Sequence, residues 1–185
     1  MKTTLNKIRE HNPRSYVWRD LLSYLGKTKA DDEPLSLLTI LDSNGLDDAL
    51  WRLRAVEGYD REMRLFAVWC ARQVQHLLTD QRSLDALDVA ERFANGEATE
   101  VELVAAAAMD AANAAEANVD DAVDVWAAMW AAWAAAYAAR DAAYAAMWAA
   151  AYAVDAARSD WSTAPYDKEL WAKQEAELRR ICEEG

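Results

Sequence analysis

Residues 126–158 read WAAMWAAWAAA, YAARDAAYAAM and WAAAYAVDAAR, which are three consecutive copies of an 11-residue repeat. Eleven residues make three turns of α-helix at about 3.67 residues per turn, so equivalent positions stay on one side. At about 100° per residue, the bulky positions form one stripe, and nearly all positions on the far side are alanine. The repeat therefore predicts a helix with a bulky face and a smooth face, each of which needs a neighbour.

The repeat lies inside a longer helical tract. Residues 98–159 contain 30 alanines in 62 positions, and no Gly or Pro occurs there. Thr99 and Glu102 have the spacing of a capping box, in which each side chain satisfies a free amide of the other residue. We expect 120–159 to form one helix about 60 Å long, with 118–121 as the place where the tract could break.

The segments on either side of this tract also favour helix. Turn residues divide residues 1–97 into short amphipathic stretches, with Ser83 as an expected N-cap and 61–78 as one longer helix. No alternating strand pattern is present. After Pro165, residues 166–184 are amphipathic. We predict an all-α protein with a short-helix bundle over 1–97, the tract over 98–159 and a C-terminal helix within 160–185, joined in one structural unit.

The aromatic stripe is the first candidate binding surface. It is interrupted by Arg140 and Asp141, which either form a local salt-bridged notch or line a polar slot for an anionic aromatic ligand such as a nucleotide. The residues of this candidate site are Trp126, Trp130, Trp133, Tyr137, Arg140, Asp141, Tyr144, Trp148 and Tyr152.

The alanine face allows close backbone approach by another helix. The expected partner is a second copy of the chain, so we predict a homo-oligomer, most simply a dimer. The alternative is a monomer whose N-terminal helices cover the tract. The positions expected to mediate self-association are Ala128, Ala135, Ala139, Ala146 and Ala150.

Charge limits the possible partners. The formal net charge is −12, from 20 basic and 32 acidic side chains. A protein of this charge is not expected to bind nucleic acid, whose phosphates need a basic surface. It could instead meet a protein with a basic surface. The stretch before residue 30 is the one basic region, with seven Lys or Arg against Glu10 and Asp20.

The sequence contains no recognisable catalytic signature. Cys70 and His76 lie on different sides of their expected helix, so they do not form a nucleophile–base pair. Cys70 is expected in the core and Cys182 at the surface, and paired carboxylates sit at helix starts, where capping explains them. We therefore expect no enzymatic activity, no metal site and no cofactor.

The location is expected to be cytoplasmic, that of a bacterium or of a phage-infected host. Two cysteines do not make a disulfide framework, and neither a signal peptide nor a strongly apolar span of about 20 residues is recognisable. A membrane association is not expected.

Three stretches resemble a family of alanine-rich helical proteins of bacteria and their phages. These are DSNGLDDALWRLRAV at 42–56, REMRLFAVWCARQVQHLL at 61–78 and SLDALDVAERFANGEAT at 83–99, followed by the Ala-Trp repeats. The resemblance covers about residues 34–158, and some relatives are described as immunity proteins of polymorphic-toxin systems. It implies a non-enzymatic protein that binds and inhibits a partner, of the immunity or phage anti-defence type. The alternatives are a nucleotide-sequestering protein and a purely structural helical oligomer.

Overall fold

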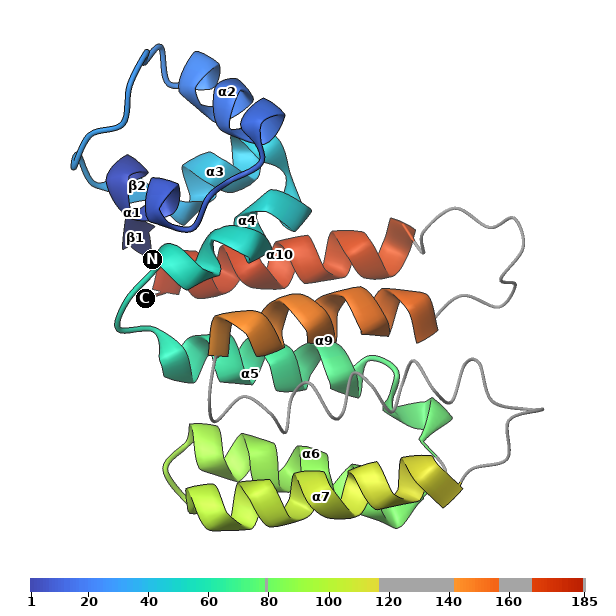
Figure 1. The fold of residues 1–185 in the computed structure, drawn as a ribbon. Helices are drawn as coiled ribbons and strands as arrows, with labels where there is room; N and C mark the ends of the chain where they lie inside the picture. The colour runs from blue at the N-terminus through green and yellow to red at the C-terminus, as the bar shows by residue number, and fades with distance from the viewer. Residues whose placement is uncertain (79, 117–141, 157–167, 185) are drawn as a thin grey trace. The chain divides into compact units, whose positions relative to one another are not determined.

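The computed structural model describes residues 1–78, 80–116, 142–156 and 168–184. These residues are mostly helical, which confirms the all-α class, and they contain one small two-stranded sheet (Figure 1). None of the helices described is long and apolar enough to span a membrane.

The chain forms two compact units. Unit 1 comprises residues 1–59 and 178–185, and unit 2 comprises residues 60–177. These boundaries do not coincide with the compositional segments 1–97, 98–159 and 160–185, because contacts define a compact unit and composition does not.

Unit 1 is built from short elements around an apolar core. Its elements are β1 (Lys2–Thr3), α1 (Leu5–Glu10), α2 (Ser15–Tyr24), β2 (Leu35–Ser36), α3 (Leu37–Asn44), α4 (Leu46–Arg52) and the 3-10 turn η1 (Leu53–Ala55). Strands β1 and β2 pair antiparallel, with Thr3 opposite Leu35. The sequence pattern missed them, because two residues are too few to alternate. The core includes Leu5, Ile8, Leu21, Leu37 and Ile40, all of which are buried.

Unit 2 contains longer helices. They are α5 (Asp60–Arg72), the 3-10 turn η2 (Gln75–Leu77), α6 (Gln81–Ala94), α7 (Glu100–Glu116), α9 (Ala142–Ala156) and the first part of α10 (Lys168–Glu184). Two predictions were wrong in detail. The α-helix from Asp60 ends at Arg72 and does not reach 78, and the N-cap of α6 is Asp80, which accepts from the Arg82 amide at 2.8 Å. Ser83 is buried inside α6.

Helices α6 and α7 form a tight hairpin (Figure 1). Gly96 ends the turn of α6 with a φ of 76°, a left-handed conformation that suits glycine. The capping box is confirmed, because the Thr99 amide donates to Glu102 at 2.8 Å and the Glu102 amide donates to Thr99 Oγ1 at 3.2 Å. Leu103 and Ala107 form the buried face of α7, which packs on α6.

Helix α9 is the described part of the repeat tract, and it packs against α5. Of the long helix predicted over 120–159, only residues 142–156 are described, so the prediction of a single helix is not tested over the rest. Among the α9 positions whose burial is described, the buried ones are Ala142, Ala145, Ala146, Ala149, Ala150 and Ala153. Their spacing places them on one side of the helix, as the repeat predicts.

Candidate functional site

The aromatic stripe is described only at its C-terminal end. Trp126, Trp130, Trp133, Tyr137, Arg140 and Asp141, together with the side chain of Tyr144, lie outside the described part of the chain. Trp148 and Tyr152 of α9 are half-buried, and their rings stack with centroids 5.1 Å apart and an interplanar angle of 19°. The two rings therefore cover part of each other. A ligand slot at Arg140 stays a prediction.

The alanine face required a correction at two positions. Ala146 and Ala150, expected to contact a second copy, are fully buried within the chain, where α9 packs against α5. The physical reason is that α5 of the same chain lies along α9, and small side chains such as Ala67, Cys70 and Ala71 are among the buried residues of α5. These two alanines are not available to another molecule. Ala128, Ala135 and Ala139 lie outside the described residues.

A buried polar side chain joins α10 to this face. Gln174 is fully buried, and its Nε2 donates to the Ala150 carbonyl oxygen at 2.8 Å. A buried side-chain amide needs a hydrogen-bond partner, so this bond favours one register of the two packed helices over the others. The sequence did not single out Gln174, because a glutamine on an amphipathic helix looks like a surface residue.

The net charge is confined to unit 2. Unit 1 contains 11 basic and 11 acidic side chains, whereas unit 2 contains 9 basic and 21 acidic ones, so unit 2 accounts for the whole charge of −12. The compositional segment 1–97 has a net charge of −2, so it is not neutral. The units of the structure separate the charge more completely, because residues 60–97 and most of α10 belong with the acidic tract.

Part of the acidity of α6 and α7 is neutralised within unit 2. Ion pairs neutralise acids of these two helices or of the N-cap of α6. Their distances between the guanidinium nitrogen and the carboxylate oxygen are 2.9 Å for Arg72–Asp88, 2.5 Å for Arg72–Glu91, 2.9 Å for Arg82–Asp80 and 3.4 Å for Arg92–Glu102. Hydrogen bonds from Thr99 lower the pKa of Glu102, and the bond from Arg82 lowers the pKa of Asp80.

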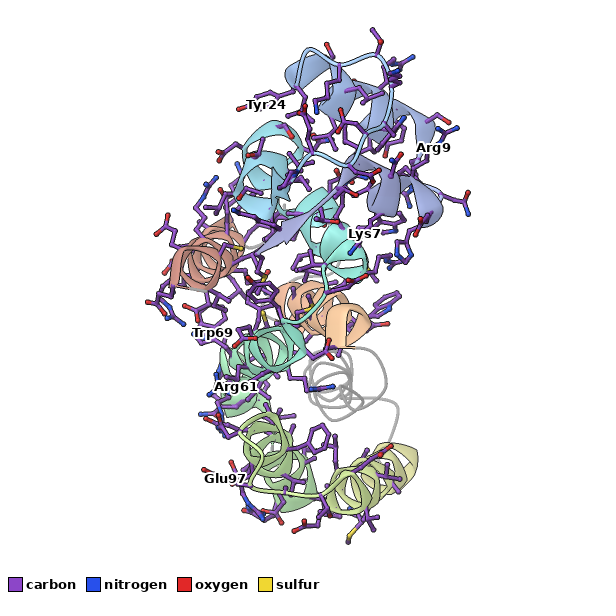
Figure 2. The ribbon with its side chains drawn as sticks, turned by 90° about the vertical axis from the view of Figure 1, so that its left-hand side faces the viewer. Lys7, Arg9, Tyr24, Arg61, Trp69 and Glu97 are labelled. Atoms are coloured by element: carbon purple, nitrogen blue, oxygen red, sulfur yellow. The ribbon has the colours of Figure 1, made fainter. Side chains whose placement is uncertain are left out.

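Three exposed acids of this hairpin make no ion pair with any described residue. They are Asp85 on α6, Glu97 in the turn and Glu100 at the start of α7. Figure 2 shows Glu97 at the end of the hairpin, below Arg61 of α5. The Arg61 guanidinium pairs with Glu62 at 3.7 Å, and its Nη2 donates to Asn95 Oδ1 at 2.8 Å, so it forms no ion pair with Glu97. The exposed end of the hairpin therefore keeps a negative charge.

Exposed apolar side chains accompany these acids. Val101, Val104 and Met109 of α7 are 78%, 50% and 59% exposed. The composition of residues 98–116 assigns them to the alanine-rich tract and does not single out these side chains. The available signal was that EVELVAAAAM is apolar on two opposite sides of a helix, more than one neighbour can bury.

Metal-ligating side chains and the two cysteines were the remaining candidates for chemistry. No cluster of three or more metal-ligating side chains occurs in the ranges that the structure describes. Burial raises the pKa of the Cys70 thiol well above its usual range, which disfavours the thiolate form that acts as a nucleophile. Cys182, expected at the surface, is buried in unit 1, and desolvation raises its pKa as well.

Comparison with known proteins adds no relative to this description. No family model matches the sequence, and no curated protein or solved structure matches it either. The resemblance over about residues 34–158 therefore remains an expectation from the sequence. The hairpin of α6 and α7, with its exposed acids and apolar side chains, is the candidate functional surface.

Proposed function

We propose that this chain is a non-enzymatic binding protein that sequesters a partner with a basic surface. The observation that supports the proposal best is that one compact unit is neutral while the other carries the whole net charge of −12. A charge needed only for solubility has no reason to be confined to one unit, whereas a charge that steers a partner has to be on the contacting surface.

The proposed mode of action is inhibition by occupancy. An acidic surface attracts a basic partner from a distance, which speeds encounter, and contacts inside the interface then hold the complex. A bound inhibitor of this kind blocks the basic surface that the partner uses for its own target. This is the immunity or phage anti-defence role that the family resemblance implies, and it requires no catalytic residue.

The test compares two charge variants of the full chain in affinity capture from a bacterial lysate. The first replaces the three unpaired acids of the hairpin, Asp85→Asn, Glu97→Gln and Glu100→Gln. The matched control removes three exposed acids of unit 1, Glu10→Gln, Asp20→Asn and Asp32→Asn. Both variants change the net charge by the same amount, so they differ only in where the charge is lost.

The proposal expects a basic protein that the wild type and the control retain and that the hairpin variant loses. Its binding should weaken steeply as salt is raised from about 50 to 300 mM, because exposed charges are screened. Equal capture by both variants would contradict the proposal. A partner with an acidic surface would contradict it as well.

A further inference from the structure

Exposed apolar side chains are concentrated on one helix. Five large hydrophobic side chains are exposed among the described residues, and three of them, Val101, Val104 and Met109, lie on α7. The other two are Tyr16 and Tyr24, both on α2 of unit 1. Single exposed apolar residues are ordinary, but a group on one helix face marks a contact surface.

The α7 residues form one continuous face. On a helical wheel that starts at Val101, Val104 lies at about −60°, Met109 at about 80°, and the exposed Ala105 and Ala108 lie between them. Leu103 lies near 200° and is buried against α6. The outer face of α7, defined as Val101, Val104, Ala105, Ala108 and Met109, therefore points away from the neighbour that α7 already has.

Charged side chains border this face on both sides. Glu100 lies at about −100° and Glu102 at about 100° on the same wheel, and both are exposed. The turn before α7 adds Glu97. On the Glu102 side, Arg92 Nη2 lies 3.4 Å from Glu102 and also donates to the Glu97 carbonyl oxygen at 3.2 Å, so the unpaired acids of the border are Glu97 and Glu100. The border therefore carries a net negative charge. The small side chains of Ala105 and Ala108 at the centre of the face allow another helix to approach closely.

We propose that the outer face of α7 binds an amphipathic helix whose apolar stripe is flanked by Lys or Arg. This proposal rests on the proposed function and specifies where and what the chain binds. An apolar centre with a charged border is the usual anatomy of a protein interface. The spacing of Val101, Val104 and Ala108 at i, i+3 and i+7 matches the anchors of helix-to-helix recognition. The acidic border selects a basic helix over a second copy of α7, since two acidic borders would repel each other.

The probes are three synthetic peptides of about 18 residues, a length at which helices form readily on binding. The first has leucines along one helical face and lysines elsewhere, the second has the same composition in scrambled order, and the third is oligolysine. Binding to the full chain is measured by fluorescence anisotropy at two salt concentrations. We expect the amphipathic peptide to bind at least tenfold more tightly than either of the others.

The decisive variant is Val101→Ser with Val104→Ser, which removes apolar surface from exposed positions and leaves the packing on α6 intact. It should weaken the amphipathic peptide about fivefold or more and leave oligolysine unchanged. The control is Tyr24→Ser, which removes an equally exposed side chain from unit 1 and should change neither. The pair Glu97→Gln and Glu100→Gln should weaken the binding of all three basic peptides and reduce its salt dependence.

The outcomes separate this proposal from the broader one. If basic peptides bind but the valine variant binds them like the wild type, the outer face of α7 is not the site, although an acidic binding function stands. If no basic peptide binds, both proposals fail. If light scattering finds a dimer that the valine variant converts to monomer, the occupant is a second copy and the basic helix is overturned.

Discussion

At the scale of single residues, the ion pair between Arg52 and Asp48 is the least ordinary feature of unit 1. The Arg52 side chain is fully buried, and its Nε donates to Asp48 Oδ2 at 2.8 Å. Its Nη1 has no hydrogen-bond partner in the described part of the chain. The guanidinium also lies over the Trp51 ring, 5.6 Å from its centroid. Burying these two charges costs desolvation free energy, which their mutual attraction offsets. Removal of either residue would leave an uncompensated buried charge and destabilise the fold.

Replacement of Arg52 by Met should therefore lower the free energy of unfolding by about 3 kcal/mol at neutral pH. Desolvation already raises the pKa of Asp48, so its contribution to stability is full below the unfolded value and is lost as pH rises through the folded value. Without Arg52 this effect grows, and the deficit of the variant should shrink towards about pH 4. Urea unfolding at several pH values measures this, with the half-exposed Arg54→Met as control. A deficit independent of pH would refute it.

At the scale of elements, the start of α7 depends on the capping box of Thr99 and Glu102. Thr99→Ala should destabilise unit 2 by about 1 kcal/mol, whereas Thr99→Ser, which keeps the oxygen, should be nearly neutral. Because hydrogen bonds from Thr99 lower the pKa of Glu102, their contribution is present above the unfolded pKa and is lost as pH falls through the folded one. Thermal unfolding should show a smaller acid dependence in Thr99→Ala. Equal acid dependence in the two variants would contradict this.

The contact between α9 and α5 makes a second prediction at this scale. Ala146→Leu adds three carbon atoms at a fully buried position, so it should cost about 2 kcal/mol or more, since the two helices must separate. Ala151→Leu on the exposed side of the same helix should change stability by less than about 0.5 kcal/mol. Urea denaturation of both variants checks the difference. If Ala146→Leu were tolerated as well as Ala151→Leu, the close packing against α5 would be wrong.

At the scale of the whole molecule, the uneven charge predicts where stability can be gained. Like charges within unit 2 repel one another, so reversing an unpaired acid there should raise the melting temperature. Glu97→Lys should do so by a degree or two, and Asp32→Lys in the neutral unit 1 should have little effect. Added salt should reduce the gain, because it screens the repulsion. A larger gain from Asp32→Lys would contradict this account.

Local signals predicted the ends of some helices and failed at others. The capping box at Thr99 depends on neighbouring residues only, and it is present. Ser83 and Asp80 are both good N-cap residues, and the sequence could not rank them. In the structure α6 begins at Gln81, which makes Asp80 the N-cap and places Ser83 inside the helix, where it is buried. Helix propensity alone predicted that the helix continues past Arg72 to residue 78. In the structure the α-helix ends at Arg72, and a 3-10 turn follows at Gln75–Leu77.

The sequence by itself determined that the chain is helical, since alanine propensity, helical periodicity and capping residues act within a few positions. It also determined that the six alanines found buried on α9 lie on one side of that helix. Only the tertiary structure decided that α5 covers this face at Ala146 and Ala150. It also decided that the net negative charge belongs to unit 2, and that one side of α7 stays apolar and exposed. These properties depend on which distant segments meet, and the free energy that selects them comes from burial between elements, which no local pattern encodes.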